Sequence, residues 1–180
     1  MYEKYLWLFI AFCFLFLILL CNKKVCLWLV LKEQFYVFKN AKANRISVWD
    51  NLCFFIFPWI ISFIFVYKLN LVVKNNLAEL LTTVFSIIFT VLFGFASVMI
   101  SKIDSNKKIE KQVAEETFVS IVSSTILSLF AAITSILITQ VKEEMILQIL
   151  SFILYSISLI IIMFLLLITK RTFLLYIEGK

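Results

Sequence analysis

Thr117-FVSIVSSTILSLFAAITSILITQ-Val141 and Met145-ILQILSFILYSISLIIIMFLLLI-Thr169 are two apolar runs that contain no Asp, Glu, Lys, Arg or His. A helix needs about 20 apolar residues to cross the ~30 Å hydrocarbon core of a bilayer, and both runs reach that length. Three further runs share this property: residues 5–21, 52–67 and 80–101. The sequence therefore predicts an all-α integral membrane protein, a helical bundle of about five transmembrane helices.

The composition fits such a chain and excludes several enzyme classes. Of 180 residues, 63% are hydrophobic, two are Gly, one is Pro and none is His. Glycines only at Gly94 and Gly179 cannot build a phosphate-binding loop, and without His there is no Ser-His-Asp or H-E-x-x-H site. We expect a non-enzymatic protein without catalytic residues, cofactors or metals. The cysteines lack metal-ligand spacing and are expected to be free thiols: Cys13, Cys21, Cys26 and Cys53.

All charged residues lie outside the five runs. An ion-coupled transporter or intramembrane hydrolase usually needs an ionisable group inside the bilayer, where such a group is costly. The absence of Asp, Glu, Lys, Arg and His from the runs therefore argues against these classes. The acidic pairs Glu115-Glu116 and Glu143-Glu144 are expected to be charges at helix ends. Most of the 17 Lys and Arg residues follow the first, third and fifth runs. The positive-inside rule then puts residues 22–50, 102–116 and the C-terminal tail in the cytoplasm, and the N-terminus outside a bacterial inner membrane.

The first run, residues 5–21, has two interpretations. A signal peptide would have a more basic start than Met1-Tyr-Glu-Lys4 and an Ala-x-Ala cleavage pattern, so an uncleaved span is favoured. If this run does not span, four helices remain and both chain ends lie inside. We divide the chain into residues 1–50, an N-terminal transmembrane helix with an amphipathic segment, and residues 51–180, a four-helix transmembrane bundle.

The segment 22–50 carries apolar residues at helical spacing. Their positions are i, i+3, i+7 and i+10: Trp28, Leu31, Phe35 and Phe38. This pattern predicts an amphipathic cytoplasmic or interfacial helix. It serves either as a lipid-facing anchor or as a docking surface for a cytoplasmic partner. Its basic residues are attributed to topology and anionic lipid, so no direct nucleic-acid binding is expected.

Small and hydroxyl residues recur every four residues in two spans. The main positions in the third span are Thr82, Ser86, Thr90 and Gly94, and those in the fourth are Ser120, Ser124, Ser128 and Ser135. One interpretation is a packing seam, because small residues let helices approach closely. The other is a narrow, weakly selective pore lined by several copies of the chain, since neutral hydroxyls form no charge ring. A homo-oligomer in the lipid bilayer is expected, and in the second interpretation its copies line the pore.

Pro58 lies inside the second apolar run. Because Pro lacks an N–H group, it is expected to kink the helix. The kink is either a static feature of shape or a hinge.

Three stretches resemble a group of small bacterial membrane proteins. They are Trp49-Asp-Asn-Leu-Cys-Phe-Phe-Ile-Phe-Pro58, Leu81-Thr-Thr-Val-Phe-Ser86 with Leu92-Phe-Gly94, and Glu115-Glu116-Thr-Phe-Val-Ser120. Residues 46–168 resemble the transmembrane effectors encoded beside retron reverse transcriptases and in other anti-phage cassettes, with the membrane subunit of the Kiwa system as a second likeness. The resemblance implies abortive infection: a reverse transcriptase with its noncoding RNA would restrain the membrane protein until phage attack.

The leading hypothesis is accordingly a non-enzymatic inner-membrane effector of antiviral defence that permeabilises or depolarises the membrane. Two alternatives stay open. One is a membrane anchor or accessory subunit that recruits a cytoplasmic enzyme complex. The other is a small channel or transporter for a neutral solute.

Overall fold

The computed structural model describes residues 27–37, 39–40, 45–46, 48–103 and 108–178, and its fold is a helical bundle, as predicted. The three long helices are α5 (Asn75–Ile103), α6 (Lys108–Gln140) and α7 (Glu144–Glu178). The remaining elements are α2 (Leu27–Val37), β1 (Lys39–Asn40), β2 (Arg45–Ile46), α3 (Val48–Asn51), the π-helical turn η1 (Leu52–Ile56), α4 (Phe57–Phe63) and the π-helical turn η2 (Ile64–Lys68).

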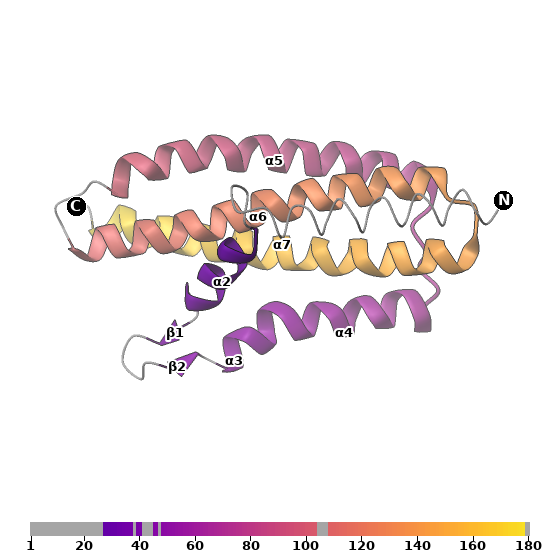
Figure 1. Ribbon diagram of the computed structural model, residues 1–180, viewed down its shortest axis with the longest axis horizontal. Coiled ribbons are helices and arrows are strands. Elements are labelled where there is room, and N and C mark those ends of the chain that lie inside the picture. The colour runs from indigo at the N-terminus through magenta and orange to yellow at the C-terminus, as the bar shows by residue number, and fades with distance from the viewer. Residues whose placement is uncertain (1–26, 38, 41–44, 47, 104–107, 179–180) are drawn as a thin grey trace.

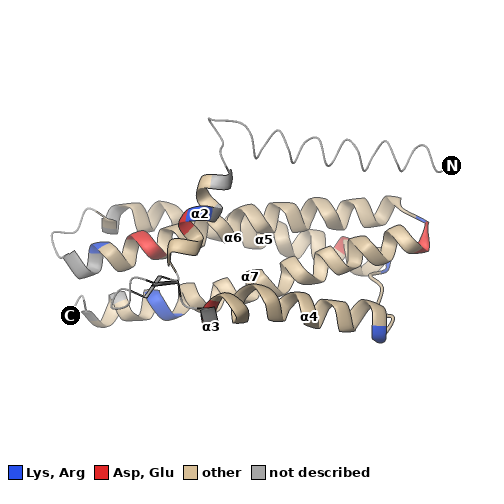
Figure 2. Cartoon of the chain, turned by 60° about the horizontal axis from the view of Figure 1, so that its bottom comes forward, with Lys and Arg blue, Asp and Glu red and all other residues tan. Residues whose placement is uncertain are grey.

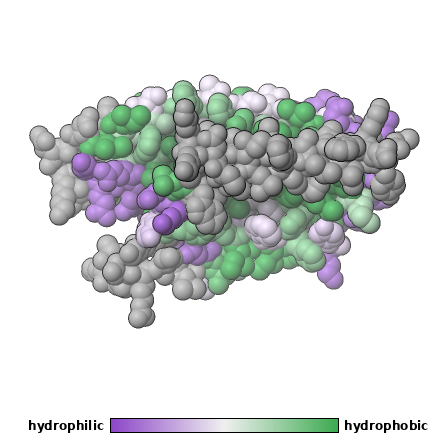
Figure 3. Space-filling model, viewed as in Figure 1, coloured by the Kyte–Doolittle hydropathy of each residue, from purple (hydrophilic) through white to green (hydrophobic). Residues whose placement is uncertain are grey.

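Four stretches of the described chain are long and apolar enough to cross a membrane: Trp49–Lys68, Asn75–Ile100, Lys111–Gln140 and Glu144–Leu174. They contain the second to fifth apolar runs, which supports a multi-pass membrane protein. The first run, with its alternatives of span or signal peptide, lies outside the described residues. In Figure 2 most charged residues lie toward the two ends of the bundle, and in Figure 3 hydrophobic residues cover much of the described surface between them.

Helices α5, α6 and α7 run side by side along the long axis of the molecule (Figure 1). Helix α6 lies between the other two. Of the residues in its most apolar 18-residue stretch, 56% are buried, against 17% in the corresponding stretch of α5 and 33% in that of α7. At 1.5 Å per residue, α6 and α7 are each about 50 Å long, more than the ~30 Å of hydrocarbon. We call the end of the bundle where α6 begins and α7 finishes the Arg171 end, and the opposite one the Gln140 end.

The stretch α3–η1–α4–η2 packs against α7 mainly through aromatic rings. Phe54 and Phe164 have ring centroids 5.9 Å apart, and Trp59 meets Phe152 edge-on at 5.7 Å. Phe65 approaches Tyr155 in the same edge-on manner at 5.9 Å. Such pairs contribute roughly 0.5–1.5 kcal/mol each beyond burial of their area. The contacts are spread along the whole span, so α4 is held to α7 at both ends.

Pro58 sits in the first turn of α4, directly after η1. The wider π-helical turn lets the Phe57 N–H reach the Leu52 carbonyl, five residues back. On the other side the Ser62 hydroxyl donates to the Pro58 carbonyl at 2.7 Å, and both residues are buried. The helix therefore accommodates Pro58 by a π-helical turn and a side-chain hydrogen bond.

Residues 69–74 cross from η2 to α5 in an irregular conformation. Asn70 has a positive φ of 53°, a region that Asn tolerates better than most residues. The buried Val73 N–H donates to the Ser151 hydroxyl on α7 at 3.0 Å. This hydrogen bond ties the loop to the bundle at the Gln140 end.

A helix, α2, lies in the segment where an amphipathic helix was predicted, and it packs on α6 (Figure 1). Among the α2 side chains that the structure describes, Gln34 is buried, at 1% exposure, whereas Phe35 of the predicted apolar series is 41% exposed and stacks on Phe55. The side chains of Trp28, Leu31 and Phe38 lie outside the described part of the structure. After α2, strands β1 and β2 pair antiparallel, with Lys39 opposite Ile46 and Asn40 opposite Arg45.

Candidate functional site: two hydroxyl stripes and the Arg171 end

The α6 stripe is buried inside the bundle. All four of its predicted serines have 0% exposure: Ser120, Ser124, Ser128 and Ser135. Each hydroxyl donates to a carbonyl of its own helix, at 2.8 to 3.1 Å. Because the donors are satisfied locally, the small side chains can face neighbouring helices without requiring polar partners. The packing interpretation fits this stripe.

The α5 stripe faces away from the bundle. Thr82 is half-buried, whereas Ser86, Thr90 and Gly94 are exposed, and a Cβ added at Gly94 would meet no atom within 4 Å. The hydroxyls of Thr82, Ser86 and Thr90 also donate to carbonyls four residues back, at 2.8 to 2.9 Å. Among the described residues of one copy, the packing interpretation therefore does not fit Ser86, Thr90 and Gly94.

A different set of α5 residues makes the contact with the core. It repeats every seven residues, and each member is at most 4% exposed: Ala78, Phe85, Leu92 and Met99. A seven-residue repeat keeps one side of a helix against a neighbouring helix. The hydroxyl stripe lies on the other side of α5, where lipid or another copy would meet it.

A charged pair joins α6 to α7 at the Arg171 end. The Arg171 guanidinium lies 3.2 Å from a Glu116 carboxylate oxygen, with the side chains 13% and 33% exposed. The same guanidinium donates to the Ser120 hydroxyl at 3.4 Å, and Gln112 donates to the second Glu116 oxygen at 3.1 Å. From the sequence, Arg171 is expected to be a topology charge and Glu116 a helix-end charge. Their pairing depends on how α6 and α7 meet, which spacing along one helix does not reveal.

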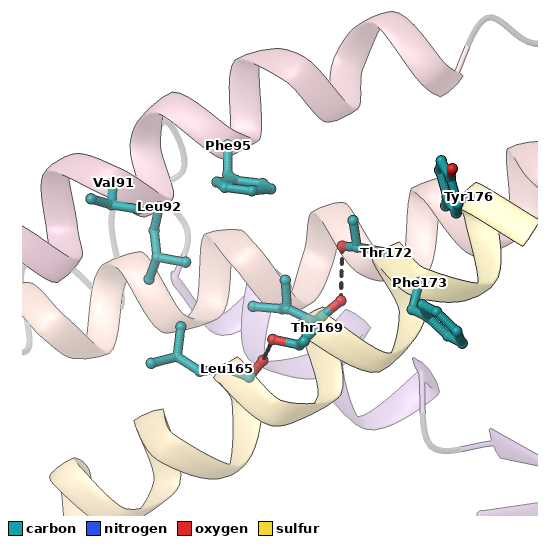
Figure 4. A pocket seen from close by; sticks show the side chains of 9 residues that line it. Val91, Leu92, Phe95, Leu165, Thr169, Thr172, Phe173 and Tyr176 are labelled. Atoms are coloured by element: carbon teal, nitrogen blue, oxygen red, sulfur yellow. Dashed lines mark hydrogen bonds between the residues drawn. The ribbon is translucent and has the colours of Figure 1, made fainter.

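A groove of about 340 Å³ lies between α5 and α7 near the same end (Figure 4). Its α5 wall consists of Val91, Leu92 and Phe95, and its α7 wall runs from Leu165 to Tyr176. The Thr169 and Thr172 hydroxyls donate to carbonyls of their own helix, the two dashed bonds of Figure 4. The groove is therefore predominantly apolar and offers few polar contacts to a ligand.

Neither the cysteines and possible metal ligands of the described residues nor comparison with known proteins identifies a family. Cys53 is a free thiol, whereas Cys13, Cys21 and Cys26 lie outside the described residues. No group of three or more His, Cys, Asp or Glu in the described chain is arranged to hold a metal ion. Comparison with known protein families, curated proteins and solved structures gave no match. The features of this chain that bear on its function are therefore the two hydroxyl stripes and their surroundings.

Proposed function

We propose that the protein is a non-enzymatic, oligomeric membrane effector that permeabilises a bacterial inner membrane, with α5 of several copies lining the path. The observation that carries the proposal is the exposure of Ser86, Thr90 and Gly94 on a helix whose other exposed side chains are mostly large and apolar. The described residues of one copy leave this part of the stripe uncovered. Copies that face one another through α5 would bring the stripes together around a shared axis.

The hydrogen bonds of the stripe define what such a path would offer a solute. The Ser86 and Thr90 protons already bond carbonyls of α5, which leaves oxygen lone pairs as acceptors. A surface of neutral acceptors holds water and small cations weakly, so the path would conduct with little selectivity. Uncontrolled conduction of this kind dissipates the membrane potential.

The defence role is supported by the resemblance of residues 46–168 to retron-associated effectors. In that setting a cytoplasmic partner, such as a reverse transcriptase with its noncoding RNA, restrains the protein until infection. The chain itself would contact lipid and its own copies rather than nucleic acid. Phage infection would release the restraint and cause abortive infection.

Membrane potential in bacteria that express the protein alone tests the proposal. We expect a voltage-sensitive dye to report depolarisation, and we expect Ser86→Leu combined with Thr90→Leu to abolish it at unchanged expression. Val84→Leu adds bulk at another exposed position of α5 and is the matched control. Full depolarisation by the double variant, or loss of depolarisation in the control, would contradict a path lined by the stripe.

A specific observation favours the membrane-anchor alternative. Phe173, Tyr176 and Ile177, in the last turns of α7, are 61%, 63% and 51% exposed. An exposed apolar surface near a membrane boundary suits either the lipid interface or a partner. Unchanged membrane potential, together with stoichiometric co-purification of a neighbouring gene product, would favour this second function.

A further inference from the structure

Three polar side chains in the described part of the chain have buried atoms without a protein hydrogen-bond partner. Gln34 on α2 is 1% exposed, and neither its Oε1 nor its Nε2 has a partner. Ser123 on α6 is 3% exposed with an unpartnered hydroxyl, and Asn51 in α3 has an unpartnered, buried Oδ1. We call these residues the orphan polar set.

Ser123 differs in this respect from the other buried hydroxyl residues. Every other buried Ser or Thr in the described chain has a hydrogen bond, either to its own helix or to a loop: Ser62, Thr117, Ser120, Ser124, Ser128, Thr134, Ser135, Ser151 and Ser156. Ser124, the next residue, donates to the Ser120 carbonyl at 2.8 Å. A buried polar group without a hydrogen-bond partner is destabilising, so the Ser123 hydroxyl is suited to a partner other than the described protein atoms.

Each of the three orphan residues is close in sequence to a residue that contacts one aromatic cluster, formed by Phe35, Phe55 and Phe164. Phe35, the neighbour of Gln34, stacks on Phe55 with ring centroids 5.1 Å apart. Phe55 lies four residues after Asn51 and meets Phe164 edge-on at 6.1 Å.

The third orphan residue reaches the same cluster from α6. Leu127, one helical turn after Ser123, packs against the cluster of Ile160 and Phe164. Helix α2 packs on α6, and Figures 1 and 2 both show α2 against the bundle. On its own element, each member of the orphan polar set is thus within about one helical turn of a residue that contacts the aromatic cluster.

Two of the orphan residues lie toward the Arg171 end relative to the aromatic cluster. Asn51 precedes Phe55 and Ser123 precedes Leu127, so both lie on the side of the cluster nearer the Arg171 end. Ser120, which accepts a hydrogen bond from Arg171, is one turn before Ser123 on α6. Along α6, polar side chains thus run from Glu116 through Ser120 to Ser123. Leu127, which packs against the cluster of Ile160 and Phe164, follows one turn later.

We propose that Gln34, Asn51 and Ser123 bind water that enters from the Arg171 end, so that the apolar bundle contains an internal hydrated site. The set offers three neutral oxygens and one amide NH₂, which matches a molecule that both donates and accepts. A buried water typically makes two to four such bonds. The site belongs to the interior of one copy and does not depend on assembly through α5.

Thiol accessibility tests the site in purified protein reconstituted in lipid nanodiscs. In a background with the four native cysteines replaced by Ala, we compare Ser123→Cys with Ser124→Cys. Both positions are buried, but only Ser123 belongs to the orphan polar set. The probe is 2-aminoethyl methanethiosulfonate, a small charged reagent that reacts with a hydrated thiolate. We expect roughly tenfold faster labelling at Ser123→Cys; equal rates at both positions would overturn the proposal.

Thermal unfolding of Gln34→Leu provides a second measurement that does not depend on a new thiol. If water satisfies the Gln34 amide, the Leu substitution leaves that water and its other partners without a hydrogen bond, so the Tm falls. If the site is dry, Leu removes an unsatisfied polar group and the Tm rises or stays unchanged, which would overturn the proposal. Should Ser123→Cys fail to fold, this shift in Tm decides alone.

Discussion

Helices α5 and α6 carry the same four-residue hydroxyl pattern in opposite surroundings. On α6 the serines are fully buried, whereas on α5 Ser86, Thr90 and Gly94 are exposed. The difference lies in how many described neighbours cover each helix. Helix α5 packs mainly on α6 and gives it the seven-residue series from Ala78 to Met99, whereas α6 lies between two neighbours and buries its serines together with bulky residues such as Ile121 and Ile138. A hydroxyl stripe is therefore buried where neighbouring helices cover more than one side of its helix.

The largest loss of stability is expected at the charged pair that joins α6 to α7. Glu116→Leu leaves Arg171 without its carboxylate. Removing one partner of a buried pair costs about 3–5 kcal/mol, and the partial exposure of Glu116 lowers the expectation to about 2–3 kcal/mol of unfolding free energy. Glu79→Leu changes an exposed acid on α5 and should leave stability unchanged. Reversible unfolding in mixed micelles measures both, and equal effects would contradict the contrast between the helices.

The next prediction compares the stripes directly. Ser124→Leu inserts three carbon atoms into a fully buried contact and should destabilise the protein by about 1–3 kcal/mol. Ser86→Leu places the same atoms on the exposed side of α5 and should change stability by less than about 0.5 kcal/mol. Both are read from the same unfolding assay. A destabilised Ser86→Leu variant would show that the α5 stripe is covered in the assayed state.

A smaller effect separates hydroxyls that join segments from hydroxyls that bond their own helix. Ser151→Ala removes the acceptor of the buried Val73 N–H and should cost about 1–2 kcal/mol. Ser158 donates only to the Leu154 carbonyl at 2.6 Å, so Ser158→Ala is the control with an effect near zero. Hydrogen exchange at the Val73 amide should accelerate only in the first variant. Unchanged exchange there would mean that the loop is held by packing alone.

The four described spans could be predicted from sequence because charge-free apolar length is a property of each segment alone. The orientation of each stripe could not, since it depends on which neighbouring helix covers which face. The seven-residue spacing of Ala78, Phe85, Leu92 and Met99 is visible in the sequence, but the sequence does not decide whether this series or the hydroxyl stripe meets the core. The Glu116–Arg171 pair and the burial of Gln34 require knowledge of helix contacts between distant segments. Hydropathy thus predicts the membrane-spanning helices, whereas the contacts between helices determine which side of each helix is buried.

The smallest effect is expected at Pro58, the predicted hinge. Aromatic contacts hold the span to α7 on both sides of it, through Phe54 before and Trp59 after, and the Pro58 carbonyl already accepts the Ser62 hydroxyl. Pro58→Ala supplies an N–H at a position where η1 has already displaced the backbone ladder, so stability should change by less than about 1 kcal/mol. Because the contacts fix α4 independently of Pro58, we also expect unchanged depolarisation in the dye assay. A variant with normal stability and lost depolarisation would instead identify Pro58 as a working hinge.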